Sequence, residues 1–165
     1  MESKIQHHET KILKGRSVLE NLCEECLFLG DKVLIVFADN AIKQSGLYAR
    51  VVSLLNICGI EHVTYECSGL HYTAEEITNA IALGKQENVQ LVLAIGDEEL
   101  MCFTKIVAYG FHGQDLISDG APTHLPIINV SAILKQNTKR ELDFVYPKNN
   151  YAHIKPVALF LDYDF

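Results

Sequence analysis

Apolar and polar positions alternate along this chain with two periods, one typical of strands and one typical of helices. The runs VLIVFA (33–38) and LVLAI (91–95) are continuously apolar, and each is bounded by helix signals. Such runs are typical of strands that are covered on both faces, so we predict that both lie at the centre of a parallel sheet. Further strand candidates cover residues 10–14, 62–67, 126–130 and 157–161.

Helical segments are predicted between these strands from capping signals and from apolar stripes. Ser17 with Glu20, and Thr73 with Glu76, have the spacing of capping boxes, in which each side chain satisfies a backbone amide of the other. Apolar residues at helical spacing follow both boxes. Two more helices are predicted over residues 47–58, which end before Gly59, and over residues 97–108.

Strands that alternate with helices imply a parallel sheet with right-handed crossovers. We therefore predict an α/β fold, a Rossmann-like parallel sheet with helices on both faces. Residues 1–165 show no repeat, linker or low-complexity tract, so one domain is expected. Residues 110–124 are predicted to form a loop, and a short hairpin is predicted near 142–146.

Composition excludes several classes of function. The formal charge of −7 opposes binding to nucleic acid or to anionic membranes, so neither is an expected partner. No apolar run is long enough to span a bilayer, and the polar N-terminus does not resemble a secretory signal. The five cysteines do not suggest a disulfide framework, so reduced thiols and a cytoplasmic location are expected.

The stretch VLIVFADNAIKQSGLYARVVSLLNICGI (33–60) has the order strand, Asp, short spacer, Gly and long helix ending in Gly-Ile. In this it resembles the N-terminal domain of the iron-containing alcohol dehydrogenases, whose fold is similar to that of glycerol dehydrogenase and dehydroquinate synthase. The resemblance extends over nearly the whole chain. It implies that Asp39 contacts the adenosine end of a dinucleotide cofactor and influences the choice between NAD and NADP.

A second matching stretch is LVLAIGDEELMCFTKIVAYG, where the family has Gly-Gly-Gly-Ser, then Asp, then Ala-Lys. Gly96 and Lys105 retain the family pattern. Asp97, Glu98 and Glu99 stand in place of the other two glycines and the serine. The resemblance implies that these five residues mark the cofactor site, although its phosphate-binding pattern is overwritten.

Two later segments complete the resemblance. LPIINVSAILKQNTK (125–139) lies where the family has a Pro-Thr-Thr-Ala-Gly-Thr-Gly-Ser-Glu segment, but it does not keep the small and hydroxyl residues. KPVALFLDYDF (155–165) resembles the strand that closes the family's first domain. The family's helical second domain, with an Asp and three His as metal ligands, has no counterpart in this sequence, so no catalytic or metal-ligating residue is predicted.

The three acids after Gly96 change the chemistry of a phosphate site. A pyrophosphate normally takes free amides and the positive end of the dipole at a helix N-terminus. Asp97 is expected to cap the helix itself, and Glu98 and Glu99 add bulk and negative charge. One carboxylate about 4 Å from a phosphate costs about 4 kcal/mol at an intermediate dielectric, whereas the dipole returns about 1 kcal/mol or less. The acids either stabilise a helix start or form an acidic pocket with a role of its own.

Cys23 and Cys26 form a CxxC pair, which has two alternative interpretations. A structural zinc site usually needs four ligands, and a redox motif favours positive surroundings rather than the intervening Glu24 and Glu25. Both cysteines fall on the apolar stripe of a predicted helix. Packing in the core is therefore the expected role.

These observations leave three hypotheses for function. The first is a degenerate dinucleotide-binding-type domain, a pseudoenzyme that acts as a binding or scaffold domain for a protein or small ligand. The second is an NAD(P)-dependent oxidoreductase component whose catalytic domain is supplied elsewhere. The third is a divalent-cation-dependent enzyme that uses Asp39 with the acidic turn at 97–99. We expect weak or no binding of NAD(P), and a homodimer, since members of the family often associate through the first strand.

Overall fold

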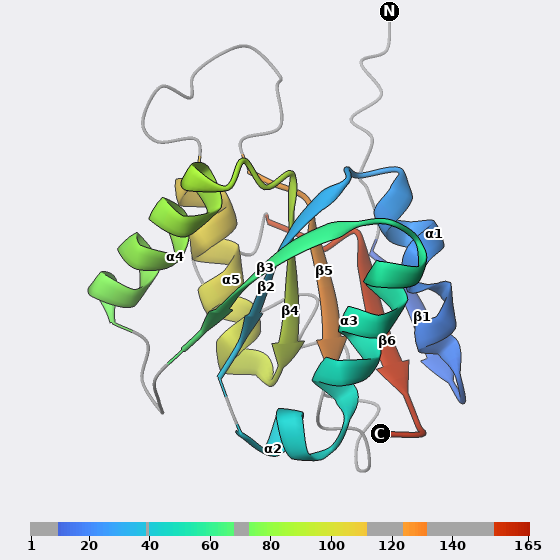
Figure 1. Cartoon of the computed structure of the whole chain (residues 1–165). Coiled ribbons are helices and arrows are strands. Elements are labelled where there is room, and N and C mark those ends of the chain that lie inside the picture. The colour runs from blue at the N-terminus through green and yellow to red at the C-terminus, as the bar shows by residue number, and fades with distance from the viewer. Residues whose placement is uncertain (1–9, 39, 68–72, 112–123, 132–153) are drawn as a thin grey trace, which may run out of the picture.

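A computed structural model describes residues 10–38, 40–67, 73–111, 124–131 and 154–165 of the chain. The alternation of strands and helices that the sequence predicts is confirmed (Figure 1). The strands are β1 (Lys11–Gly15), β2 (Lys32–Phe37), β3 (Glu61–Glu66), β4 (Leu91–Gly96), β5 (Ile127–Ser131) and β6 (Ala158–Asp162). The helices are η1 (Val18–Asn21, a 3₁₀ helix), α1 (Leu22–Leu27), α2 (Asn40–Gln44), α3 (Leu47–Ile57), α4 (Ala74–Gln86) and α5 (Glu98–Gly110).

The described strands form one sheet in the order β1-β6-β5-β4-β2-β3, and every pairing in it is parallel. The predicted α/β class and the Rossmann-like parallel sheet are thus confirmed. The runs that the sequence placed at the centre, β2 and β4, pair with each other inside the sheet. Their side chains from Val33 to Phe37 and from Leu91 to Ile95 are buried, as expected of strands covered on both faces.

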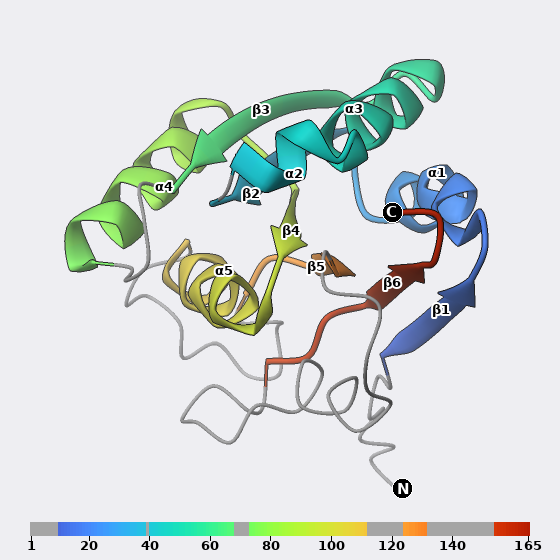
Figure 2. The ribbon, with the colours of Figure 1, turned by 90° about the horizontal axis from the view of Figure 1, so that it is seen from below.

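Helices cover both faces of the sheet, as predicted. Figure 2, which looks toward one end of the strands, shows α1, α2 and α3 on one face and α4 and α5 on the other. The two sets bury the apolar stripes that their sequences predict, with Leu47, Val51 and Leu55 on α3 and Phe103 and Val107 on α5. No helix in the described ranges combines the length and the apolar character that a membrane crossing requires.

The two predicted capping boxes have different outcomes. Thr73 caps α4, because its side chain accepts a hydrogen bond from the Glu76 amide at 3.2 Å. The prediction at Ser17 is wrong: its backbone is left-handed with φ of 56°, and its side chain makes no capping bond. The chain then forms the short η1 before α1 rather than one continuous helix. The amides that start η1 are instead satisfied by residues from the end of the chain.

Some predictions fall where the structure is not described. The loop predicted over 110–124 lies mostly in the undescribed range 112–123, and the hairpin predicted near 142–146 lies wholly within 132–153. Asp39 also lies outside the described residues. The role that the resemblance implies for Asp39 therefore stays a prediction.

Candidate functional site

The candidate site is the turn between β4 and α5, at the carboxyl edge of the sheet. β4 ends at Gly96, and Asp97 leads into α5 with an extended backbone. The Asp97 side chain accepts a hydrogen bond from the Leu100 amide at 3.0 Å, and its carbonyl oxygen accepts one from Met101 at 3.1 Å. Asp97 is thus the N-cap of α5, as its position predicts. One of the amides that a phosphate would use is already occupied.

Gly96 shows a second difference from an open phosphate site. In dinucleotide-binding turns, glycines let the backbone approach the pyrophosphate closely. Here a Cβ placed on Gly96 would meet the Leu100 side chain, with its Cδ2 only 2.5 Å away. Leu100 is buried, so the space beside Gly96 is filled by the protein's own side chain. The glycine is needed here to let α5 pack against the end of β4.

Glu98 and Glu99 complete an acidic first turn on α5. Both side chains are exposed, as is that of Asp97, so three carboxylates face solvent at the start of this helix. Their negative charges interact favourably with the positive end of the helix dipole, and this interaction stabilises the helix. The same three charges repel an anion that approaches from this side. The turn therefore does not fit the pyrophosphate of a dinucleotide.

Lys105 is the remaining family-like residue, and it lies away from this turn. It sits about two turns along α5, on the stripe of the helix that also carries Met101, and it is fully buried. Within the described part of the chain, its Nζ atom has no hydrogen-bond partner. The pKa of Lys105 is lowered to about 8, mainly by burial; Cys102 opposes the shift, and the nearby charge of Lys155 adds to it. The structure thus places Lys105 in the interior of the domain, and the role that the resemblance implies for it stays a prediction.

A buried polar side chain on β5 was not predicted from the sequence. Asn129 is fully buried and lies in register between Ala94 on β4 and Leu159 on β6. Neither its Oδ1 nor its Nδ2 atom has a hydrogen-bond partner among the described residues. The signal in the sequence was one polar residue inside the apolar run PIINV. Asn129 faces the same side of the sheet as Leu159, which packs with Met101 of α5.

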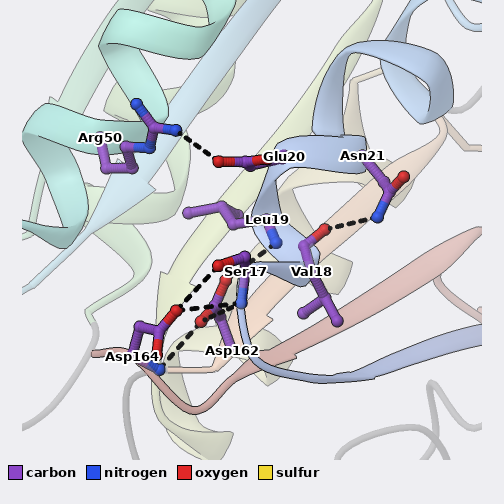
Figure 3. Close-up of polar contacts among 8 residues, drawn as sticks. All are labelled: Ser17, Val18, Leu19, Glu20, Asn21, Arg50, Asp162 and Asp164. Carbon is purple, nitrogen blue, oxygen red and sulfur yellow. Dashed lines mark hydrogen bonds and ion pairs between the residues drawn. The ribbon is translucent and has the colours of Figure 1, made fainter.

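At the start of η1, also at the carboxyl edge of the sheet, an acid side chain again accepts hydrogen bonds from backbone amides (Figure 3). Asp162, at the end of β6, is buried and accepts hydrogen bonds from the amides of Leu19 at 2.9 Å, Asp164 at 2.9 Å and Ser17 at 3.3 Å. Asp164 accepts from the amide and the hydroxyl of Ser17 at 3.1 and 3.0 Å. Sequence reasoning missed this cluster because its partners lie at opposite ends of the chain.

The CxxC pair divides between two environments. Cys26 is fully buried, and burial raises the pKa of its thiol to about 12, so core packing is confirmed for this residue. Cys23 is half-buried, and its thiol donates a hydrogen bond to the carbonyl oxygen of Leu54 on α3 at 3.2 Å. Core packing is confirmed for Cys23 as well, because it packs against the same core on the side that faces α3.

Comparison with known proteins agrees with the resemblance seen in the sequence. The sequence profile of the iron-containing alcohol dehydrogenases matches residues 9–136. The chain is 33% identical over 103 residues to the probable NADH-dependent butanol dehydrogenase 1 of Bacillus subtilis, covering 61% of this chain and 26% of that protein. It is 29% identical over 140 residues to the NADH-dependent butanol dehydrogenase A of Clostridium acetobutylicum, covering 81% of this chain and 36% of that protein.

Solved structures show the same fold. The NADH-dependent butanol dehydrogenase A of Thermotoga maritima superposes with a TM-score of 0.72 and 24% identity, over 98% of this chain and 44% of that one. A further iron-containing alcohol dehydrogenase superposes with a TM-score of 0.76 and 20% identity, over 93% of this chain and 45% of that one. The chain thus spans less than half the length of these relatives. Since the family profile covers well over half of the sequence, the chain belongs to the iron-containing alcohol dehydrogenase family.

Proposed function

We propose that this chain is a degenerate dinucleotide-binding-type domain, which acts as a binding or scaffold domain and does not carry out hydride transfer by itself. The observation that carries the proposal is the closed turn at Gly96. Asp97 occupies an amide of α5, and Leu100 fills the space beside the glycine. The negative charges of Glu98 and Glu99 add repulsion to that steric closure.

The second candidate is an NAD(P)-dependent oxidoreductase component that works with a catalytic domain supplied elsewhere. Family membership favours it, since the relatives are named as NADH-dependent butanol dehydrogenases. The fold also superposes on that of a solved butanol dehydrogenase, with a TM-score of 0.72. This candidate requires the α5 turn to accept a dinucleotide, so the affinity for the cofactor separates the two proposals.

The direct test is calorimetric titration of the chain with NADH and NADPH, each with and without magnesium. We expect a dissociation constant well above about 10 micromolar, which corresponds to a binding free energy weaker than roughly −7 kcal/mol. Tighter binding would contradict the proposal and favour the oxidoreductase component. Affinity that appears only with magnesium would favour a cation-dependent role for the acidic turn.

A variant that restores the family pattern tests the cause. Asp97→Gly with Glu98→Gly and Glu99→Ser removes the cap and the three charges, and we expect it to bind NADH more tightly than the parent chain. Glu24→Gln with Glu75→Gln is the control, because it removes two exposed carboxylates from other helices. If the triple variant gains no affinity, the acidic turn is not the cause, and the altered segment 131–139 becomes the better explanation.

We also propose that the chain forms a homodimer through β1. Among the described strands, β1 pairs only with β6, so no described strand covers its other edge. Ile12 on this edge strand is 41% exposed, and an open strand edge is a template for pairing with a second chain. Sedimentation at about 100 micromolar is expected to show dimer, with Ile12→Lys weakening it. Monomer alone at that concentration would contradict the proposal.

A further inference from the structure

The thiols of Cys23 and Cys58 both donate to one backbone oxygen. This oxygen lies on the face of the sheet that α1 and α3 cover. The Cys23 thiol, on α1, donates to the carbonyl oxygen of Leu54 at 3.2 Å. The Cys58 thiol, which follows α3, donates to the same oxygen at 3.1 Å. Figures 1 and 2 both show α1 and α3 side by side. The two sulfur atoms are therefore close neighbours, although many residues separate them in the sequence.

The two thiols also contact each other. Burial raises the pKa of Cys58 to about 11, and a hydrogen bond with the Cys23 thiol contributes to that shift. Both side chains are half-buried, so reagents in solution have access to them. Cys26, one turn after Cys23, is fully buried and points into the core. The pairing that geometry supports is thus Cys23 with Cys58, not the Cys23 and Cys26 of the CxxC motif.

We propose that Cys23 and Cys58 are a reversible dithiol–disulfide pair, a modification site that joins α1 to the end of α3 when a small-molecule disulfide oxidises it. The Cys23 thiolate attacks one sulfur of the small-molecule disulfide, a mixed disulfide forms, and one thiol leaves. The Cys58 thiolate then attacks the Cys23 sulfur, and the second small-molecule thiol leaves. The protein loses two electrons and two protons, and the co-reactant gains both.

The environment assigns the order of these steps. The nucleophile in thiol–disulfide exchange is the thiolate, so a raised pKa slows attack at neutral pH. Cys58, with its pKa at about 11, is the poorer first nucleophile, and Cys26, with its pKa at about 12, is poorer still. Cys58 reacts in the second step because it is held beside the Cys23 sulfur, and proximity compensates for a small thiolate fraction.

The test is oxidation of the whole folded chain with glutathione disulfide, followed by mass spectrometry. We expect the intact mass to fall by two hydrogen atoms, with reversal by dithiothreitol. Proteolysis after glutamate, lysine and arginine separates the candidate cysteines from one another. It cuts between Cys23 and Cys26 at Glu24 and Glu25, between Cys26 and Cys58 at Lys32, Lys43 and Arg50, and between Cys58 and Cys67 at Glu61 and Glu66. The crosslinked peptide pair should contain Cys23 and Cys58. A Cys23–Cys26 link, a link to Cys67 or Cys102, or glutathione adducts that never resolve would each overturn the proposal.

Variants and thermal melting complete the test. Oxidation should raise the melting temperature, because a crosslink restricts the unfolded chain. Cys58→Ser should stop the reaction at the mixed disulfide on Cys23, whereas Cys102→Ser, a half-buried cysteine on the other face, should leave the crosslink unchanged. An unaltered crosslink in Cys58→Ser would overturn the assignment. Since the parent chain alone reports the crosslinked pair, the test holds even if a variant folds poorly.

Discussion

Two aspartates at the carboxyl edge of the sheet both accept hydrogen bonds from amides at a helix start. One is close in the sequence to the helix that it caps, and the other is far from it. Asp97 follows β4 and accepts from the amide of Leu100, three residues later. Asp162 ends β6 and accepts from the amide of Leu19, which lies near the other end of the chain. Each carboxylate satisfies backbone donors at the start of a helix, where such donors lack partners within the helix.

The two sites differ in what they hold together. Asp97 is exposed and closes only its own helix, so its effect is local. Asp162 is 2% exposed and ties the loop after β1 to the last strand. A short-range cap can be predicted from residue type and spacing, whereas a long-range one needs the sheet order that brings β1 beside β6. At both places at least one backbone donor that could bind an anion already donates to an acid from the chain.

The largest effect is expected from removing the long-range acid. Asp162→Ala leaves the amides of Leu19 and Asp164 without their acceptor and loses the shared bond to Ser17. Hydrogen bonds to a charged group contribute about 1.5–3 kcal/mol each, and buried unsatisfied donors add to the loss. We expect the free energy of unfolding to fall by about 3 kcal/mol, measured by urea denaturation.

Asp164→Ala is the matched control for this variant. Asp164 contacts the same Ser17 but its side chain is exposed, so its loss should cost about 1 kcal/mol or less. Equal effects from the two variants would show that burial does not distinguish Asp162 and would break the comparison.

The buried amine of Lys105, which has no hydrogen-bond partner among the described residues, contrasts with the two aspartates. It shows how much stability a buried charge costs when no polar group binds it. Burial lowers the pKa of Lys105 to about 8 from an ordinary value of 10.5. Below pH 8 the amine is charged in both the folded and the unfolded chain, so the folded chain bears the full free-energy cost of burying the charge. Between pH 8 and 10.5 the folded chain releases its proton first, and stability rises with pH.

Lys105→Met removes the charge and should abolish this dependence. Relative to that variant, the parent chain should gain about 3 kcal/mol or less between about pH 7 and about pH 10. Urea denaturation at the two pH values measures the difference, and Lys85→Met, an exposed lysine on α4, controls for the loss of a surface amine. A difference that stays constant with pH would mean that the pKa of Lys105 is the same in the folded and the unfolded chain, as expected of an amine that is paired or hydrated in the folded chain.

The parts of the fold that the sequence predicts well are those set by neighbouring residues. The apolar runs of β2 and β4 and the caps at Thr73 and Asp97 follow from patterns a few residues long. The Ser17 box failed although its spacing was correct, because two distant carboxylates accept from the Ser17 amide that Glu20 was expected to bind.

Contacts between distant segments account for what the sequence did not reveal. Cys58 gave no sign that it lies beside Cys23, since only the packing of α1 against α3 brings the two together. Asn129 stood out as polar in an apolar run, but its place between β4 and β6 depends on the sheet order. Lys105 matched the family motif, but its complete burial depends on the packing of α5 and could not be seen in the sequence.

Apart from the control variants, the smallest expected effect is the loss of the local cap at Asp97. Asp97→Ala removes the side-chain acceptor of the Leu100 amide from a first turn whose own residues 97–99 are exposed. Replacing an N-cap typically costs about 1 kcal/mol, so the free energy of unfolding should fall by that amount, about a third of the expected Asp162→Ala effect. Thr73→Ala on α4 is the matched control, since Thr73 makes the same bond to Glu76 on another helix. If Asp97→Ala costs no more than Thr73→Ala, its acid serves chiefly as a cap. If Asp97→Ala instead stabilises the chain, repulsion among Asp97, Glu98 and Glu99 exceeds the capping bond, and the acidic turn is held at a cost to stability, as expected of a turn with a role of its own.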